Sequence, residues 1–268
     1  MGCFIVKRYF LSYTFHRTML KNLAKICLTL VVIPGLIAGA VWYLNERHFF
    51  DLTELDFKTE FSRESPSGKP ILENEINLLS KKLAEFKGTS LFEVNLEKIQ
   101  QTIESENWVK SVEIYREWPN KLKIVIDAYD VVLLYWMNEK KIFPILENNR
   151  LLEPLTVGQA PDRTITVEKK IFAEPKVRKK AIDLLNSLPS AGSFSTAKIS
   201  EVGYDSKEGF WTELLNRELR VKLGNENFES KSLRVSQVLD YIENKQIEAR
   251  VIDANLSQKV LVRLRKEP

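Results

Sequence analysis

A stretch of twenty uncharged residues, 26–45, stands out in the pattern of hydrophobic and polar positions and reads ICLTLVVIPGLIAGAVWYLN. A helix of this length is roughly 30 Å long, which is the thickness of the hydrocarbon core of a bilayer. Its ten Ile, Leu and Val residues favour insertion into lipid by more than Thr29, Pro34 and the two glycines oppose it. The pattern therefore predicts a transmembrane helix over residues 26–45.

The charges on either side of this stretch predict its orientation. Residues 1–25 contain five basic residues and no acidic one, whereas acidic residues predominate just after the stretch. Because Lys and Arg stay on the cytoplasmic side, we expect a cytoplasmic tail over residues 1–25 and an exported body over residues 46–268. A cleavable secretory signal, with Ala38-Gly39-Ala40 as the cleavage site, is an alternative. Gly35 and Gly39 have the GxxxG spacing of a helix-dimerisation face, which also arises by chance in apolar segments.

The order of patterns along residues 46–130 is strand, helix, helix, strand, strand. The first helix has an apolar stripe at steps of three and four residues and ends at Gly88, and the second follows a potential cap at Asn95. The expected strands are 49–61, 109–118 and 122–127, with helices over 72–86 and 96–103 and a polar loop over 62–70. Because each apolar face needs a partner layer, we expect two helices to cover one face of a three-stranded sheet.

Residues 131–268 are richer in strand patterns and predict a second, mostly antiparallel β domain with two helices. Strands are expected over 132–137, 141–146, 150–155, 199–205, 210–215, 218–223, 248–253 and 259–265, and helices over 175–188 and 230–243. The pattern of residues 156–173 is ambiguous between strand and helix. The last strand would direct Val260, Val262 and Leu264 toward the core, and as the terminal strand it is a candidate for an edge of the sheet.

The charge and residue content of the exported body restrict its chemistry. After residue 48 the chain carries 34 basic and 35 acidic residues, so its overall positive charge reflects membrane orientation and gives no support for a nucleic-acid partner. Residues 49–268 contain neither Cys nor His, which excludes disulfides, Cys or His metal clusters and triads with an imidazole base. We therefore expect no enzymatic activity, no cofactor, no metal and no small-molecule substrate.

Three motifs in the first half of the chain resemble a known family. They are GTSLFEVN at residues 88–95, WVKSV at residues 108–112 and REWPNKLKI at residues 116–124. These motifs resemble the POTRA domain of the FtsQ/DivIB family of bacterial cell-division proteins. The basic tail, the single span and the Ile252-Asp253 pair near the C-terminus resemble the layout of the same family.

The sequence departs from the family pattern at two junctions. Ala128 and Val131 stand where the family usually has Glu and then Pro after the last POTRA strand. Asn255 and Leu256 stand where Arg and an aromatic residue often follow the Ile-Asp pair. The junction between the two domains is therefore expected to differ locally from that of the family.

The resemblance implies an α+β protein with a transmembrane helix over residues 26–45, a POTRA domain over 46–130 and a mostly antiparallel β domain over 131–268. It also implies a non-catalytic, single-pass type II protein of the inner membrane, with its N-terminus in the cytoplasm and its other domains in the periplasm at the division septum. Such a protein would recruit and link partners for septal peptidoglycan synthesis.

The C-terminal strand is the candidate partner-binding site. An edge strand offers unpaired backbone groups to another chain, although an edge protected by its own Lys and Arg side chains is the ordinary alternative. Leu256 and Leu261 would add apolar contacts to the strand. The resemblance implies that a complex of FtsB and FtsL binds in this region. The residues expected to take part are Leu256, Ser257, Lys259, Leu261, Arg263 and Arg265.

Two other functions fit parts of the sequence. POTRA domains also serve as periplasmic chaperone or export modules, but no series of barrel strands follows in this chain. A membrane-anchored hydrolase would use Ser195 and Lys198, which match the S-x-x-K motif without its companion signatures. Labelling of Ser195 by an activity probe would favour the hydrolase.

Overall fold

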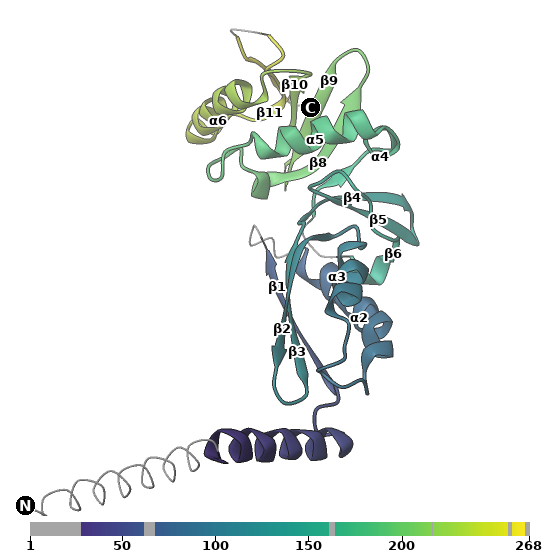
Figure 1. Cartoon of the computed structure of the whole chain (residues 1–268). Coiled ribbons are helices and arrows are strands. Elements are labelled where there is room, and N and C mark those ends of the chain that lie inside the picture. Colours follow the sequence, from purple (N-terminus) through teal and green to yellow (C-terminus); the bar gives the residue numbers. More distant parts are fainter. Residues whose placement is uncertain (1–27, 62–67, 161–163, 216, 257–258, 266–268) are drawn as a thin grey trace, which may run out of the picture. The chain divides into compact units, whose positions relative to one another are not determined.

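The computed structural model describes residues 28–61, 68–160, 164–215, 217–256 and 259–265 (Figure 1). The chain divides into two compact units. One contains the chain up to Asp56 together with residues 85–95 and 115–123, and the other contains residues 57–84, 96–114 and 124–268. This division runs through the first sheet, and the domain limits of 46–130 and 131–268 stay a prediction.

The first described element is a helix over Leu28–Glu46. Within the described ranges it is the one helix that is long and apolar enough to cross a membrane. Its large apolar side chains, Leu30 and Val31 among them, are exposed, as expected of a helix surrounded by lipid. The predicted span is thus helical from Leu28 onward, and Ile26 and Cys27 lie outside the described residues.

The first sheet has three strands among the described residues, in the order β1-β3-β2. The strands are β1 (Glu54–Phe61), β2 (Val109–Glu117) and β3 (Lys121–Ala128), and the helices are α2 (Lys69–Lys82), continued by a 3-10 turn over Leu83–Phe86, and α3 (Leu96–Glu104). Figure 1 shows α2 and α3 together on one side of these strands. The predicted order of strand, helix, helix, strand, strand is confirmed.

Residue spacing explains how this part of the chain packs. The central strand β3 buries every second residue from Leu122 to Ala128, as expected of a strand with one face on a core. Ile99 and Ile103, four residues apart on α3, are both fully buried. The helical stripe therefore meets the apolar face of the strands.

The first strand is shorter than its sequence pattern predicts. The pattern begins at Phe49, but β1 begins at Glu54. The residues before it pair with a loop: Leu52 N–H donates to the Thr89 carbonyl at 2.9 Å, and Leu91 N–H donates to the Phe50 carbonyl at 2.8 Å. The alternating apolar residues before Glu54 therefore pack against this loop and are not part of the sheet. Most of the predicted polar loop, residues 62–67, lies outside the described residues.

The second sheet has nine strands among the described residues, in the order β12-β11-β10-β9-β8-β7-β4-β5-β6. Their bounds are β4 Val131–Asn138, β5 Lys141–Leu146, β6 Leu155–Thr156, β7 Thr166–Val167, β8 Ile199–Asp205, β9 Gly209–Leu214, β10 Arg220–Gly224, β11 Ala249–Asp253 and β12 Leu261–Leu264. Neighbouring strands are antiparallel except at the β10–β11, β4–β7 and β7–β8 pairs, which are parallel. The sheet is therefore mixed, with antiparallel pairs in the majority.

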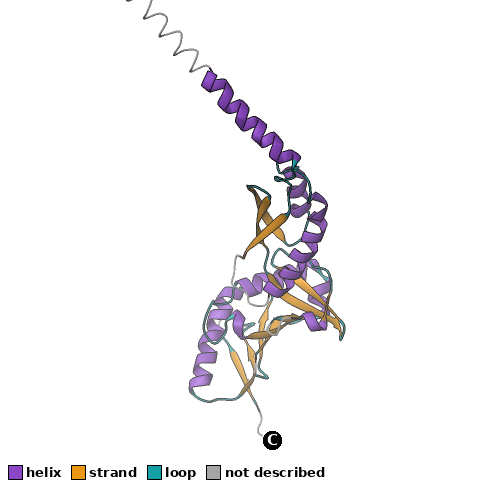
Figure 2. Ribbon diagram, turned by 90° about the horizontal axis from the view of Figure 1, so that it is seen from below, coloured by secondary structure: helices purple, strands orange, loops and turns teal. Residues whose placement is uncertain are grey.

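Two long helices accompany this sheet (Figure 2). They are α5 (Pro175–Asn186), preceded by the short α4 (Lys169–Ala173), and α6 (Phe228–Asn244). Leu184 of α5 and Leu239 of α6 lie in the same buried cluster as Phe210 and Val221 of the sheet. One apolar core thus joins both helices to the strands, and the predicted α+β class is confirmed.

Two stretches of this region differ from the sequence-based expectation. Residues 150–155 were expected as a strand, but Leu151 forms a single bridge to Ile145, and β6 is only two residues long. The ambiguous stretch contains β7 and α4, and β7 pairs with β4 and β8. A two-residue strand between partners that are distant in sequence has no periodicity of its own, so no local pattern announces it.

A tight corner stands between the end of β10 and the chain that leads into β12. Lys231 of α6 is buried, and its Nζ donates to the Leu223 carbonyl at 2.6 Å. Burial lowers the pKa of the Lys231 ammonium below its ordinary value. Gly224 has a φ of +72°, and a Cβ at this position would lie 2.1 Å from Oδ1 of Asn255. This corner requires glycine for both its backbone conformation and its space.

A second buried charge lies on α2. Burial raises the pKa of the Glu75 carboxyl above its ordinary value of 4.5, and the nearby Glu106 adds to the rise. In the folded protein this group therefore retains its proton at a higher pH than in the unfolded chain. The folded state loses stability from this group as the pH rises through its raised pKa.

Replacing Gly224 by alanine should lower the free energy of unfolding by about 1–3 kcal/mol, because the new Cβ collides with Asn255 in a left-handed backbone. Chemical denaturation of the purified full-length chain in detergent measures the change. Gly158→Ala is the matched control, since a Cβ there meets nothing within 4 Å. Equal stability of the two variants would contradict the corner's geometry.

Replacing Glu75 by glutamine should raise the melting temperature at pH 7, because the variant no longer holds a carboxylate in a buried site. The gain in melting temperature should shrink as the pH falls through the raised pKa of Glu75. It should vanish below pH 4.5, where residue 75 is uncharged in both the unchanged protein and the variant. Thermal melting as a function of pH measures this, with the exposed Glu73→Gln on the same helix as the control. A gain that persists at low pH would show that charge is not its cause.

Candidate partner-binding edge

The strand β12 lies at an end of the second sheet. It pairs antiparallel with β11, with Asp253 opposite Leu261 and Ile252 opposite Val262, and no other described strand lies on its second side. The Arg265 N–H donates to the Glu248 carbonyl at 2.9 Å. Because successive residues of a strand alternate in direction, the N–H and C=O groups of Val262 and Leu264 point away from β11.

Exposed leucines accompany this open backbone. Leu256, Leu261 and Leu264 are 47%, 49% and 61% exposed. Lys259 and Arg263 are exposed as well, so charged and apolar side chains mix along the strand. Both the expected apolar contacts, Leu256 and Leu261, are thus available on the surface. Ser257, the remaining small residue of the predicted set, lies outside the described residues.

The position of Leu264 corrects the prediction from alternation. Val260 and Val262 pack partly against the core cluster, as predicted, but Leu264 on the same face is exposed. Leu264 lies opposite Ala249, the first residue of β11, next to a shift in the strand register. The apolar core does not extend as far as Leu264. Its side chain lies on the inward face of the strand, but nothing there buries it.

Arg265 already has an acidic neighbour in its own chain. Its Nη2 lies 2.9 Å from Oε2 of Glu218, and both side chains are largely exposed. An exposed pair of this kind contributes little to stability. Arg265 can therefore exchange Glu218 for a carboxylate of another chain at small cost. Arg263, two residues earlier on the same face of the strand, is exposed as well.

The opposite end of the sheet is a poorer docking edge. β6 has only two residues, and the side chain of Leu155 is buried. A docked strand there would have few backbone groups to pair with. Of the two ends of this sheet, β12 thus offers the longer open row.

The residues of the alternative hydrolase do not form an accessible pair. Ser195 is buried, whereas Lys198 is exposed, and the backbone N–H of Lys198 donates to the Ser195 carbonyl at 2.9 Å. A buried hydroxyl cannot reach a substrate in solution. In the described part of the chain, no three His, Cys, Asp or Glu side chains gather in an arrangement that would hold a metal ion.

Sequence reasoning missed a group of aromatic side chains near the N-terminal helix. Phe50, Phe92 and Trp118 come from three separate segments and lie within 6 Å of one another by ring centroids. Phe92 and Trp118 are part of the motifs at residues 88–95 and 116–124, but the motifs alone do not show that the rings meet. The pair Phe49-Phe50 directly after the span was the available signal.

Comparison with known proteins supports the fold along most of the chain. A family model for the POTRA domain of FtsQ type matches residues 68–127, and a model for the C-terminal part of the cell division protein FtsQ/DivIB matches residues 134–255. Together these matches cover more than half of the chain, and they leave β12 outside.

Individual relatives agree with these models. The chain is 26% identical over 188 residues to the cell division protein FtsQ of Geobacter sp. (strain M21), covering 66% of each chain. It is 25% identical over 185 residues to FtsQ of Syntrophotalea carbinolica, covering 66% of this chain and 64% of the relative. It is 28% identical over 158 residues to the cell division protein DivIB of Bacillus cytotoxicus, covering 58% of this chain and 59% of the relative.

The matches span between 59% and 66% of the length of these relatives, which is less than two thirds. The order of the two family models along the chain nevertheless agrees with the observed order of a three-stranded sheet with two helices followed by a larger mixed sheet. The chain belongs to the FtsQ/DivIB family of cell-division proteins.

Proposed function

We propose that this chain is a non-catalytic, membrane-anchored division protein that holds partner proteins together during septal peptidoglycan synthesis. Its open edge strand β12 would bind a partner of the FtsB–FtsL type by accepting one more strand into the second sheet. The observation that carries this proposal is the pair of residues with outward backbone groups, Val262 and Leu264, beside the exposed side chains of Leu256 and Leu261.

The physics of strand addition supports this use of β12. Main-chain hydrogen bonds supply affinity when an extended segment joins a sheet edge, and alternate side chains supply specificity. Leu261 provides apolar contact on the outer face, and Arg263 and Arg265 provide positive charge. Because these three side chains share one face of the strand, the best fit is an extended segment that presents an apolar residue opposite Leu261 and acidic residues opposite Arg263 and Arg265 on that face.

The proposed topology follows from the helix Leu28–Glu46 and the charges beside it. The basic tail would stay in the cytoplasm, while both sheets would lie in the periplasm at the division septum. Anchoring confines the protein to the plane of the inner membrane, which raises the encounter rate with other membrane-bound division proteins. The activity consists of binding and needs no reacting group.

Charge introduced beside the open edge should weaken partner binding. Leu261→Glu and Leu256→Glu should each raise the dissociation constant for the FtsB–FtsL complex about tenfold, which corresponds to about 1.4 kcal/mol. The measurement is titration of the full-length chain in nanodiscs. The control is Leu233→Glu, an equally exposed leucine on α6. Unchanged affinity of both edge variants would remove these side chains from the interface.

A proline at the edge tests the backbone directly. Leu264→Pro removes an N–H that points away from β11, so it should abolish strand addition while the β11–β12 pair remains. Leu264→Ala removes most of the side chain but keeps the N–H, and it should bind the partner almost normally. The same titration compares the two variants, and circular dichroism checks their folding. Equal binding by both variants would exclude strand addition at this residue.

A further inference from the structure

Four aromatic side chains form a cluster that the proposed function does not use. Phe49, Phe50, Phe92 and Trp118 make up this aromatic cluster. Phe50 contacts each of the other three, with ring centroids 5.2 Å from Phe49, 5.2 Å from Phe92 and 5.9 Å from Trp118. Phe92 and Trp118 lie 4.7 Å apart. Phe49, Phe92 and Trp118 are each about half exposed, so the cluster presents an apolar surface.

Hydrogen bonds fix this cluster to the end of the N-terminal helix. The Ser90 hydroxyl lies 2.8 Å from Oδ1 of Asn45, the second-last residue of the helix. The Leu91 N–H donates to the Phe50 carbonyl at 2.8 Å. The loop that carries Phe92 is therefore bound to the helix end and to the segment that follows it.

The length of the helix places the cluster at the surface of the bilayer. Its 19 residues span roughly 28 Å, which fills the hydrocarbon core, and the interfacial layer on each side is about 5–8 Å thick. Phe49 and Phe50 follow the last helical residue, Glu46, by three and four positions. The segment that carries Phe49 and Phe50 thus leaves the helix at the depth of the lipid headgroups.

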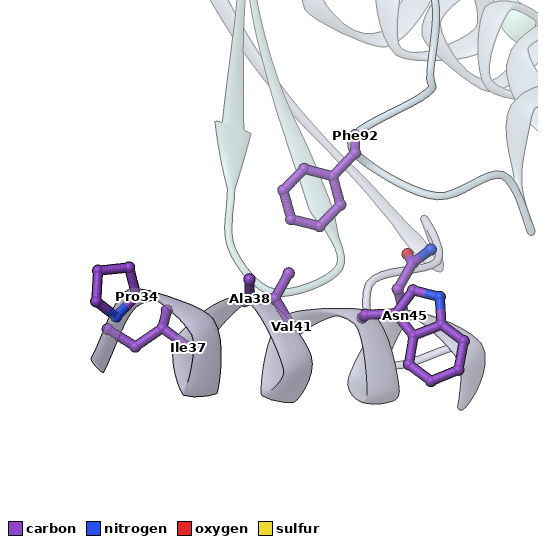
Figure 3. A pocket seen from close by; sticks show the side chains of 7 residues that line it. Pro34, Ile37, Ala38, Val41, Asn45 and Phe92 are labelled. Carbon is purple, nitrogen blue, oxygen red and sulfur yellow. The ribbon is translucent and has the colours of Figure 1, made fainter. Parts of the chain in front are cut away.

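The side of the helix next to Phe92 also indicates that lipid contacts this cluster. Figure 3 shows the Phe92 ring directed toward the helix across an apolar groove. The groove is lined by Pro34, Ile37, Ala38, Val41, Trp42, Asn45 and Phe92. One wall of the groove is the span itself, whose neighbours in a membrane are lipid chains. Ile37 and Pro34 lie nine and twelve residues before the helix end, so the groove extends from the headgroup layer toward the acyl chains, and lipid is the material that fills it.

The chemistry of the cluster suits the interface of a bilayer. Trp and Tyr gather at headgroup depth because their rings are apolar while their N–H and O–H groups stay hydrated, and Trp42 and Tyr43 at the helix end follow this rule. The charged side chains near the cluster include both signs: Arg47 stacks on Tyr43, and His48 contacts Asp51 at 2.7 Å. Binding here depends on apolar contact and needs no anionic lipid.

We infer that the aromatic cluster is a membrane-docking patch that seats the loop around Phe92 and the turn at Trp118 in the bilayer leaflet at the C-terminal end of the helix. The occupant is lipid, and the docked rings restrain the direction in which the rest of the chain extends from the membrane. This inference rests on the proposed membrane anchoring of the helix. The test must therefore measure the insertion of the helix and the lipid contact of the cluster separately.

Tryptophan quenching in liposomes provides that test. The full-length chain is reconstituted in phosphatidylcholine vesicles whose acyl chains carry bromine close to the headgroup. Three double variants each keep one exposed tryptophan, Trp42, Trp118 or Trp136, with the other two changed to Phe. The buried Trp108 and Trp211 remain in every variant as a constant background. Trp42 reports the helix, Trp118 the cluster, and Trp136 on β4 is the unquenched reference.

The inference expects quenching of Trp118 comparable to that of Trp42 and several-fold greater than that of Trp136. Replacing half of the lipid by phosphatidylglycerol should leave the Trp118 result unchanged. Adding Phe92→Glu should reduce quenching of Trp118, whereas Leu78→Glu, an exposed leucine on α2, should not.

Two results would overturn the inference and are distinguishable. If Trp42 is quenched and Trp118 behaves like Trp136, the chain is anchored but the cluster does not dock on lipid. If Trp42 is also unquenched, membrane anchoring itself fails. Trp118 emission that shifts only after other division proteins are reconstituted would assign the cluster to a protein partner and would also overturn lipid docking.

Discussion

The burial of one apolar core between the second sheet and the helices α5 and α6 supports everything toward the C-terminus. Leu184, Val235, Leu239 and Ile252 belong to this core, and β11 is held in place through its parallel pairing with β10. β12 depends on β11 for its backbone partners, and Val262 together with the preceding Val260 packs partly against the core. β12 is thus stabilised by β11 and by the core that holds β11. Its outward backbone N–H and C=O groups stay available for another chain.

A similar arrangement, in which one segment holds another in place, exists at the end of the N-terminal helix. The segment after the helix forms hydrogen bonds with the loop at residues 88–91, so Phe50 and Phe92 meet next to the span. The strand β1 starts only after these contacts are complete, at Glu54. Residues that the sequence pattern assigns to a strand instead bind the first sheet to the helix end. This arrangement limits the free length of chain between the helix and the first sheet.

Much of the fold follows from local periodicity, while the edge depends on contacts that periodicity does not contain. Alternation at Leu122, Ile124 and Ile126 predicts β3, and spacing at Ile99 and Ile103 predicts α3, because burial there repeats with the element's own period. β7 was not predictable, since its two residues are ordered by strands far away in sequence. At the edge, the exposure of Leu261 was predicted, but Leu264 was placed in the core, and the pairing of Arg265 with Glu218, 47 residues away, was invisible. The register shift beside Ala249 is a property of two strands together and has no signature in either alone.

The proposed binding at β12 would gain strength from the proposed membrane anchoring of the chain. A strand edge that offers only the outward groups of Val262 and Leu264 would hold a free partner weakly, because few hydrogen bonds must offset the loss of translational freedom. When partner and chain are both inserted in the same membrane, most of that freedom is already lost, and the effective concentration of the edge rises. A short edge would then be sufficient for the proposed binding, and it would also let the partner dissociate. The modest size of β12 is therefore consistent with assembly in a membrane, where anchoring supplies what the interface itself does not.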